Sequence, residues 1–292
     1  MTNTSKTVTF FGSGPVAAAS LRSIAEHFSV EVVITKAVPT HHKGVAPVEE
    51  LARELHLPIL FASNKNELDQ LIDQEEIKSP IGIVVDYGVI ISQKVIDHFP
   101  YGIVNSHFSL LPQWRGADPI TFSILSGDLR TGVSLMVIDA GLDTGKLITQ
   151  KVLYMSEDET TPTLTDKLVN LSNQLLAEFL PRYVNDDIQP KAQPHPDRVT
   201  YSRKLTKEDS ILDWSKPAAQ LEREVRAFRG WPKSRATVLN QAVIVTKSHV
   251  SKNANTALDI KCGDGQYLSI DELVGPSGRT MDARAFLNGY SA

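Results

Sequence analysis

Cysteine is nearly absent from this chain of 292 residues, since Cys262 is the only one. A single cysteine excludes an internal disulfide and a zinc site built from several thiolates, and it is typical of a reducing compartment. Long apolar runs are also missing: the longest, residues 81–91, is interrupted by Asp86 and falls short of the ~18 residues that a membrane span needs. Residues 1–6 are polar and show no apolar core of a signal peptide. We therefore expect a cytoplasmic protein with no membrane partner.

Neither sign of charge dominates the chain, whose formal net charge is −4. The distribution is uneven, because residues 1–198 carry 16 basic and 24 acidic side chains while residues 199–292 carry 14 and 10. The last third is therefore net positive and could face an anionic partner. An excess of basic over acidic side chains of this size is equally compatible with an ordinary solvated surface.

Short apolar runs alternate with amphipathic stretches over the first 184 residues. Residues 7–11 predict a strand, 12–14 a tight turn and 15–27 a helix that opens with a proline. Continuous apolar strands between helices are typical of a mostly parallel sheet covered on both faces. A long helix with Thr161 as its N-cap should close this domain. Further strands are expected at 30–35, 57–61, 81–85, 103–104, 132–138 and 146–154, and further helices at 47–56, 65–74, 92–98 and 119–125.

The pattern changes after residue 184. Residues 185–199 hold three prolines and no apolar periodicity, which predicts a linker that we extend to residue 204. A helix containing Leu221 follows, and then β-rich runs at 236–239, 242–246, 258–262 and 267–274. These runs fit a small barrel of roughly four to six strands. The predicted organisation is an α/β domain over 1–184, a linker over 185–204 and a C-terminal domain over 205–292.

A glycine-rich turn matches the spacing of a dinucleotide-binding loop at residues 12–17, Gly-Ser-Gly-Pro-Val-Ala. A nicotinamide enzyme also needs an acidic residue near the end of the second strand, where this chain reads Ile34-Thr35-Lys36. We therefore interpret the glycines as a tight strand-to-helix turn. His41 and His42 are neighbours in a loop, and adjacent residues seldom bind one ion, so no metal site is expected.

Asn105 and His107 stand two residues apart at the end of a predicted strand, where alternation points both side chains the same way. Ligands of open α/β sheets bind at this edge. An amide that stabilises an oxyanion beside an imidazole that donates a proton suits acyl transfer. Asp143 supplies a carboxylate that would raise the pKa of the imidazole and accept a proton from an attacking amine. Asp139 is a competing carboxylate, but Asp143 lies in the glycine-flanked loop that can approach a ligand.

Each of these residues also has a purely structural explanation when taken alone. Asn105 could form a turn, His107 could be a satisfied half-buried histidine, and Asp143 could cap a loop. Their occurrence at neighbouring strand ends is what favours a catalytic site.

Two motifs surround these residues: residues 105–116 read Asn-x-His-x-Ser-Leu-Leu-Pro-x-Trp-Arg-Gly, and residues 141–145 read Gly-Leu-Asp-Thr-Gly. These motifs resemble those of the 10-formyltetrahydrofolate-dependent formyltransferases, and within them the branch that acts on methionyl-tRNA. The similarity extends through 84–91, 200–205, 211–215, 218–223 and 226–232, so it covers nearly the whole chain. It implies a Rossmann-like catalytic domain of the formyltransferase fold with an OB-like C-terminal barrel.

The resemblance also implies a reaction and the residues that perform it. The formyl group would move from N10 of 10-formyltetrahydrofolate to the α-amine of initiator methionyl-tRNA, with no metal and in a monomer. The catalytic residues would be Asn105, His107 and Asp143, and the folate site would comprise Ser109, Leu110, Leu111 and Pro112 with Tyr87, Gly88, Val89 and Ile90. The candidate tRNA contacts are Lys36, Lys43, Arg203, Lys204, Arg223, Arg226 and Arg229, although Glu222 and Glu224 interleave with the last three and could simply balance them.

Two features depart from the tRNA-specific branch. The loop at residues 36–46 is short and offers only two lysines, and residues 288–292 form no basic tail. The acceptor therefore stays open between methionyl-tRNA and an amino sugar nucleotide. A tRNA-binding protein without catalytic activity is a third alternative, disfavoured because all three chemical residues are present.

Overall fold

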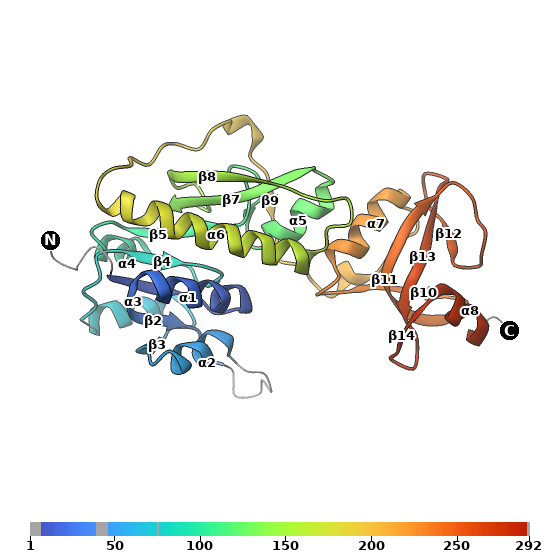
Figure 1. Ribbon diagram of the computed structural model, residues 1–292, viewed down its shortest axis with the longest axis horizontal. Helices are drawn as coiled ribbons and strands as arrows, with labels where there is room; N and C mark the ends of the chain where they lie inside the picture. The colour runs from blue at the N-terminus through green and yellow to red at the C-terminus, as the bar shows by residue number, and fades with distance from the viewer. Residues whose placement is uncertain (1–6, 39–45, 75, 291–292) are drawn as a thin grey trace. The chain divides into compact units, whose positions relative to one another are not determined.

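The computed structural model describes residues 7–38, 46–74 and 76–290, which fall into two compact units (Figure 1). The first unit draws on Met1–Pro119, Thr131–Tyr154 and Thr165–Ser202, and the second on Ile120–Arg130, Met155–Leu164 and Arg203–Ala292. His41, His42 and Lys43 lie outside the described residues.

The first unit is built on a seven-stranded sheet with the strand order β3-β2-β1-β4-β5-β7-β8. The five strands from β3 to β5 are parallel, and β7 pairs antiparallel with β5. A pair of two-residue strands, β6 and β9, lies apart from this sheet. The strands are β1 (Thr7–Phe11), β2 (Ser29–Thr35), β3 (Ile59–Phe61), β4 (Gly82–Val84), β5 (Ile103–His107), β6 (Arg115–Gly116), β7 (Arg130–Val137), β8 (Leu147–Tyr154) and β9 (Tyr201–Ser202).

Helices pack against this sheet through buried apolar side chains. Phe11 and Ile34 of the sheet share one core cluster with Leu68 of α3 and Val95 of α4. On β5, Ser106 faces α6, because its hydroxyl lies 2.6 Å from that of Ser172. The helices are α1 (Pro15–His27), α2 (Pro47–Glu54), α3 (Lys65–Gln74), α4 (Gln93–His98) and α6 (Thr161–Val184).

The glycine-rich turn joins β1 to α1 in close packing. A Cβ on Gly12 would lie 2.6 Å from the Cβ of Ala17 and 2.7 Å from the ring of Phe10, which is closer than real side chains approach. Glycine is therefore needed here so that the helix can lie against the strand, as expected for a tight strand-to-helix turn.

The second unit carries an antiparallel sheet with the order β10-β11-β13-β12, and β14 pairs with β13. Its core contains Leu221 and Val225 of α7, Leu268 and Leu273 of β13, and Phe286 of α8. The predicted fold class, a mostly parallel α/β sheet followed by a small β-barrel domain, is confirmed. The elements are α5 (Pro119–Ser126), α7 (Ala218–Ala227), β10 (Ser234–Val238), β11 (Gln241–Ser251), β12 (Asp259–Lys261), β13 (Tyr267–Val274), β14 (Thr280–Asp282) and α8 (Ala283–Tyr290), with short 3-10 turns at Pro196–Arg198 in the first unit and Glu208–Ser210 in the second.

The structure adds features that the sequence pattern did not predict. Strand β5 extends to His107, so Asn105 and His107 belong to the strand itself. Residues 185–202, predicted to be linker, group with the first unit. Helix α8 was not predicted at all. Among the described residues, no helix is long and apolar enough to cross a membrane.

Phe286 offers a direct test of the core of the second unit. Its side chain is fully buried and stacks on Tyr290 with ring centroids 4.7 Å apart. We expect Phe286→Ala to lower the free energy of unfolding by about 3–5 kcal/mol, because the transfer energy is lost and a cavity remains. Denaturant unfolding measures this change, and Arg284→Ala on the exposed side of α8 is the control. A loss below about 1 kcal/mol for Phe286→Ala would contradict this packing.

Candidate active site

Strand β5 presents Asn105 and His107 on the side of the sheet opposite Ser106. Side chains alternate along a strand, and Ser106 contacts Ser172 of α6, so its two neighbours point away from that helix. The strand ends at His107, whose side chain is only 5% exposed. The amide and the imidazole therefore share one face at a strand end, as the sequence predicts.

The imidazole of His107 is fixed by one hydrogen bond. Its Nε2 lies 2.9 Å from the backbone carbonyl oxygen of Trp114. A carbonyl only accepts, so Nε2 must carry the proton, and in a neutral ring Nδ1 then holds a bare lone pair. The turn after β5 thus selects the tautomer of the imidazole.

Burial keeps His107 neutral. Removal from water lowers the pKa of the imidazole below its usual value, while Asp143 and the Trp114 carbonyl raise it in part and Arg115 lowers it further. The carboxylate of Asp143 does raise the pKa of the imidazole, as the sequence predicts, but the cost of burying the charge outweighs this effect, so the net shift is downward.

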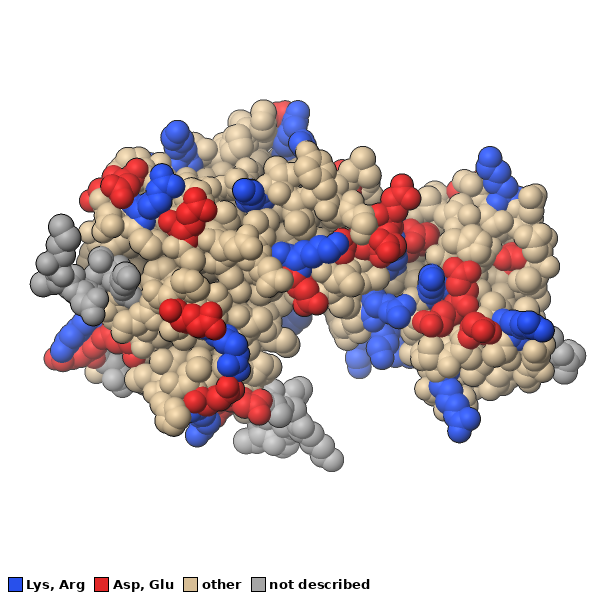
Figure 2. Space-filling view, in the orientation of Figure 1, with Lys and Arg blue, Asp and Glu red and all other residues tan. Residues whose placement is uncertain are grey.

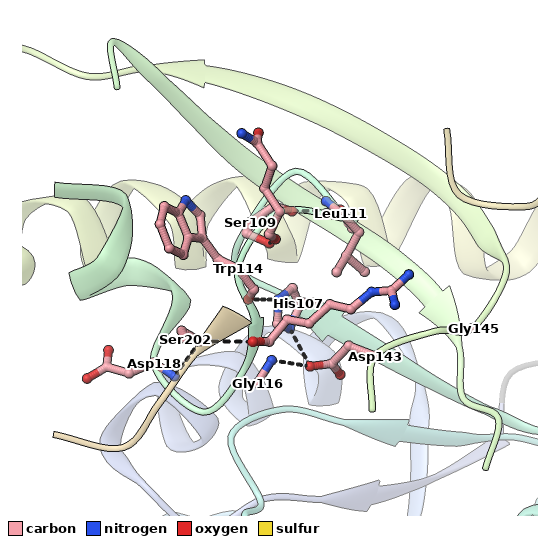
Figure 3. A network of polar contacts seen from close by, with 12 residues as sticks. His107, Ser109, Leu111, Trp114, Gly116, Asp118, Asp143, Gly145 and Ser202 are labelled. Carbon is pink, nitrogen blue, oxygen red and sulfur yellow. Dashed lines mark hydrogen bonds and ion pairs between the residues drawn. The ribbon is translucent and has the colours of Figure 1, made fainter. Parts of the chain in front are cut away.

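Asp143 faces His107 across a gap (Figure 3). One carboxylate oxygen, Oδ2, lies 3.8 Å from Nδ1 of His107 and accepts a 2.7 Å hydrogen bond from the backbone amide of Gly116. A separation of 3.8 Å is too long for a direct hydrogen bond. A nitrogen or oxygen placed beside the pair can therefore bond to both groups at once, which suits the transfer of a proton from a bound amine.

The competing carboxylate, Asp139, forms hydrogen bonds within its own loop. Its Oδ1 accepts hydrogen bonds from the backbone amide of Gly141 at 3.1 Å and from the hydroxyl of Thr144 at 2.5 Å. Asp139 thus caps its own loop, while Asp143 in the same loop faces the imidazole.

Four residues predicted to bind folate form a rigid turn after β5. The hydroxyl of Ser134 donates to the carbonyl of Ser109 at 2.6 Å and accepts from the amide of Leu111 at 3.1 Å. The Leu111–Pro112 peptide is cis. Ser109, Leu111 and Pro112 are buried and Leu110 is half-buried, so mainly Leu110 and backbone atoms can meet a ligand here.

The second predicted folate segment, residues 87–90, divides between core and surface. Tyr87 is 2% exposed, donates its hydroxyl to the carbonyl of Ala62 at 2.7 Å and packs within the core of the first unit. Val89 is half-buried, Gly88 is exposed at a φ of 67°, and Ile90 is 75% exposed. Gly88 and Ile90 are therefore the parts of this segment that are open to a ligand.

The predicted tRNA contacts are mostly engaged within the chain. Two of the arginines form ion pairs: Arg226 with Glu222, and Arg203 with Asp209. The other two donate hydrogen bonds to backbone carbonyls: Arg223 to Leu125, and Arg229 to Thr246. Lys204 is exposed, and Lys36 is half-buried. Figure 2 shows basic and acidic side chains interspersed on the visible face of the molecule.

Two groups near the site were not predicted from the sequence. The backbone amide of Gly116 binds the carboxylate of Asp143. The side chain of Gln193 contacts the loop that carries Asp143. No local pattern marks Gln193, which stands between prolines in a segment without periodicity. Among the described residues, no cluster of three or more histidine, cysteine or acidic side chains could hold a metal ion.

The fold and this geometry define an α/β protein with an amide, an imidazole and a carboxylate at the end of a central strand. A family model described as formyl transferase matches residues 5–180, and one described as the formyl transferase C-terminal domain matches residues 204–291. The chain belongs to the formyl transferase family.

Similar proteins match nearly the whole chain. It is 33% identical to a methionyl-tRNA formyltransferase of Myxococcus xanthus over 97% of this chain and 95% of that protein. It is 34% identical to a methionyl-tRNA formyltransferase of Xanthomonas euvesicatoria over 96% of each. An N-formyltransferase of Helicobacter canadensis, solved with folinic acid and dTDP-3-aminofucose, aligns with a TM-score of 0.69 at 20% identity over 91% of this chain and 98% of that chain. This last similarity shows a shared fold.

The buried neutral imidazole predicts a pH dependence of stability. The pKa of His107 is lowered in the folded protein, so below the unfolded value of 6.5 the unfolded chain takes up a proton that the native site resists. The contribution of the neutral His107 to the free energy of unfolding is therefore fully present above pH 6.5. It is lost as the pH falls, by at most about 1.4 kcal/mol per pH unit. We expect the free energy of unfolding to fall less steeply with decreasing pH for His107→Gln than for the wild type. The comparison runs between about pH 7.5 and 5, roughly the range in which an imidazole titrates. Equal slopes would show that His107 is not held neutral.

Proposed function

We propose that this protein transfers a formyl group from 10-formyltetrahydrofolate to the α-amine of methionyl-tRNA. The observation that supports it most is the facing pair of His107 and Asp143 beside Asn105, because both facing atoms can take a proton from an attacking amine. Relatives named methionyl-tRNA formyltransferase match 96–97% of the chain at 31–35% identity, and the structural neighbours described as sugar formyltransferases share 20% or less. Family membership and these names favour the tRNA acceptor over an amino sugar.

We assign complementary tasks to the three catalytic candidates. As the amine nitrogen attacks the formyl carbon, negative charge develops on the formyl oxygen, and the amide N–H of Asn105 can donate to it. The amine must lose a proton, and an amine bound beside the facing Nδ1 of His107 and carboxylate of Asp143 can give it to either atom. A proton on Nδ1 would create an imidazolium paired with Asp143, which offsets the cost of a buried charge. His107 can then return the proton to the leaving nitrogen.

The residues present fit a folate as formyl donor. When bound, the folate supplies the formyl group and accepts the proton on its leaving nitrogen. The exposed Ile90 and the backbone at Gly88 lie in one segment and the half-buried Leu110 in the turn after β5, and each offers apolar atoms against which the flat ring of a folate can pack. We assign Ser109, Leu111 and Pro112 to shaping the turn after β5 and not to polar contacts with the ligand.

The acceptor is tested by a direct comparison. Purified protein with 10-formyltetrahydrofolate should formylate methionyl-tRNA, whereas an amino sugar nucleotide should remain unmodified. Product analysis by mass spectrometry measures both reactions. Formylation of the sugar without formylation of methionyl-tRNA would overturn the proposed acceptor, and the absence of both products would overturn the proposed reaction.

The choice of carboxylate is tested by a matched pair of variants. Asp143→Asn keeps an oxygen for the Gly116 amide but removes the charge that accepts the proton, so kcat should fall by about 10²-fold or more. Asp139→Asn changes a loop cap in the same segment and should cost much less. Steady-state kinetics with methionyl-tRNA distinguishes them. A greater loss for Asp139→Asn than for Asp143→Asn would show that the carboxylates were assigned the wrong way round.

A further inference from the structure

The segment that follows α6 is bonded to the turn after β5 and to the loop that carries Asp143, so it is a strap and not a free linker. Lys191 and Leu147 of β8 exchange backbone hydrogen bonds of 2.7 and 2.9 Å. Further along the segment, the carbonyl of Thr200 accepts from the amide of Arg115 at 2.9 Å, and its hydroxyl accepts from the amide of Trp114 at 2.9 Å. The strap (residues 191–202) is therefore attached both to the edge of the sheet and to the turn whose carbonyl holds His107.

Gln193 is the residue of the strap that reaches the carboxylate loop. Its Nε2 donates to the carbonyl oxygens of Asp143 at 2.7 Å and Gly145 at 3.0 Å. Its Oε1 accepts a 2.6 Å hydrogen bond from Nη2 of Arg115. One half-buried side-chain amide thus joins the loop that carries Asp143 to the turn that follows His107.

The position of Asp143 needs such support. Its backbone lies in the left-handed region at a φ of 50°, a conformation that costs free energy for a residue with a side chain, although less for aspartate than for most, and that nearby hydrogen bonds help to hold. The Asp139 cap acts on the amide of Gly141 and the hydroxyl of Thr144 and makes no hydrogen bond with the backbone of Asp143 itself. The two bonds from Gln193 act on the carbonyls of Asp143 and Gly145.

We infer that Gln193 is a positioning residue for formyl transfer, which holds the carboxylate of Asp143 toward His107 and the Gly116 amide. This inference rests on the proposed function for its kinetic consequence, but its structural consequence can be measured without substrate. A displaced carboxylate would leave the Gly116 amide without its acceptor and would separate the two proton-accepting atoms. Small displacements of catalytic groups cost large factors in rate.

Amide hydrogen exchange of the free protein tests the structural consequence. Gln193→Ala should accelerate exchange of the Gly116 amide by about 10-fold, because the hydrogen bond from this amide to the Asp143 carboxylate is weakened. The rate should approach that of Asp143→Ala, which lacks this hydrogen bond. The amides of β5 should keep their wild-type rates. Gln189→Ala, an exposed glutamine four positions earlier, is the control and should change neither. Unchanged Gly116 exchange, or equal acceleration throughout β5, would overturn the inference.

A double-mutant cycle tests the kinetic consequence. Gln193→Ala should lower kcat for methionyl-tRNA by about 10-fold or more with little change in KM, but by less than about 3-fold when Asp143→Asn is already present. Gln193→Glu keeps the acceptor for Arg115 and loses the donor, so it should be at least as impaired as Gln193→Ala. Equal losses in both backgrounds, or full activity of Gln193→Glu, would overturn the inference. If the wild type formylates no acceptor, the proposed function fails, and the exchange measurement still decides the role of Gln193.

Discussion

The hydrogen bond from Nε2 of His107 to the carbonyl of Trp114 is the interaction on which the site depends. It fixes the proton on one ring nitrogen and leaves the other facing Asp143. Burial prevents the ring from taking a second proton in the resting state, since it lowers the pKa of the imidazole. A buried base that is neutral at rest can accept a proton when a reaction releases one, and the nearby carboxylate then stabilises the charge.

The fold supplies this arrangement from three separate segments. Strand β5 carries Asn105 and His107, the loop before β8 carries Asp143, and the strap holds the turn that provides the Trp114 carbonyl. Each segment is attached by backbone hydrogen bonds to the sheet or to its neighbour. Pre-organisation of this kind lets the catalytic groups meet the reacting atoms without rearrangement during the reaction.

Local patterns in the sequence predicted the parts of the structure that depend on local forces. The strand–helix alternation, the shared direction of Asn105 and His107, and the long helix α6 follow from periodicity. The predicted N-cap of α6, Thr161, is wrong by one residue, because the carbonyl and hydroxyl of Thr160 accept from the first amides of the helix. The approach of Asp143 to His107 was predicted from their places after neighbouring strands, but contacts made by segments without periodicity were not. The bond between Gln193 and the Asp143 loop spans 50 residues, and no periodicity marks either end. The net pKa shift of His107 was not predicted, because the presence of Asp143 in the sequence does not reveal how deeply the imidazole is buried.

The protonation state of His107 in the resting protein tests this account most directly. Nitrogen-15 NMR distinguishes the two neutral tautomers from the imidazolium, and the signal among the 8 histidines is assigned by its loss in His107→Gln. At neutral pH the account predicts a neutral ring with the proton on Nε2 and none on Nδ1. A charged ring, or a proton on Nδ1 alone, would contradict it.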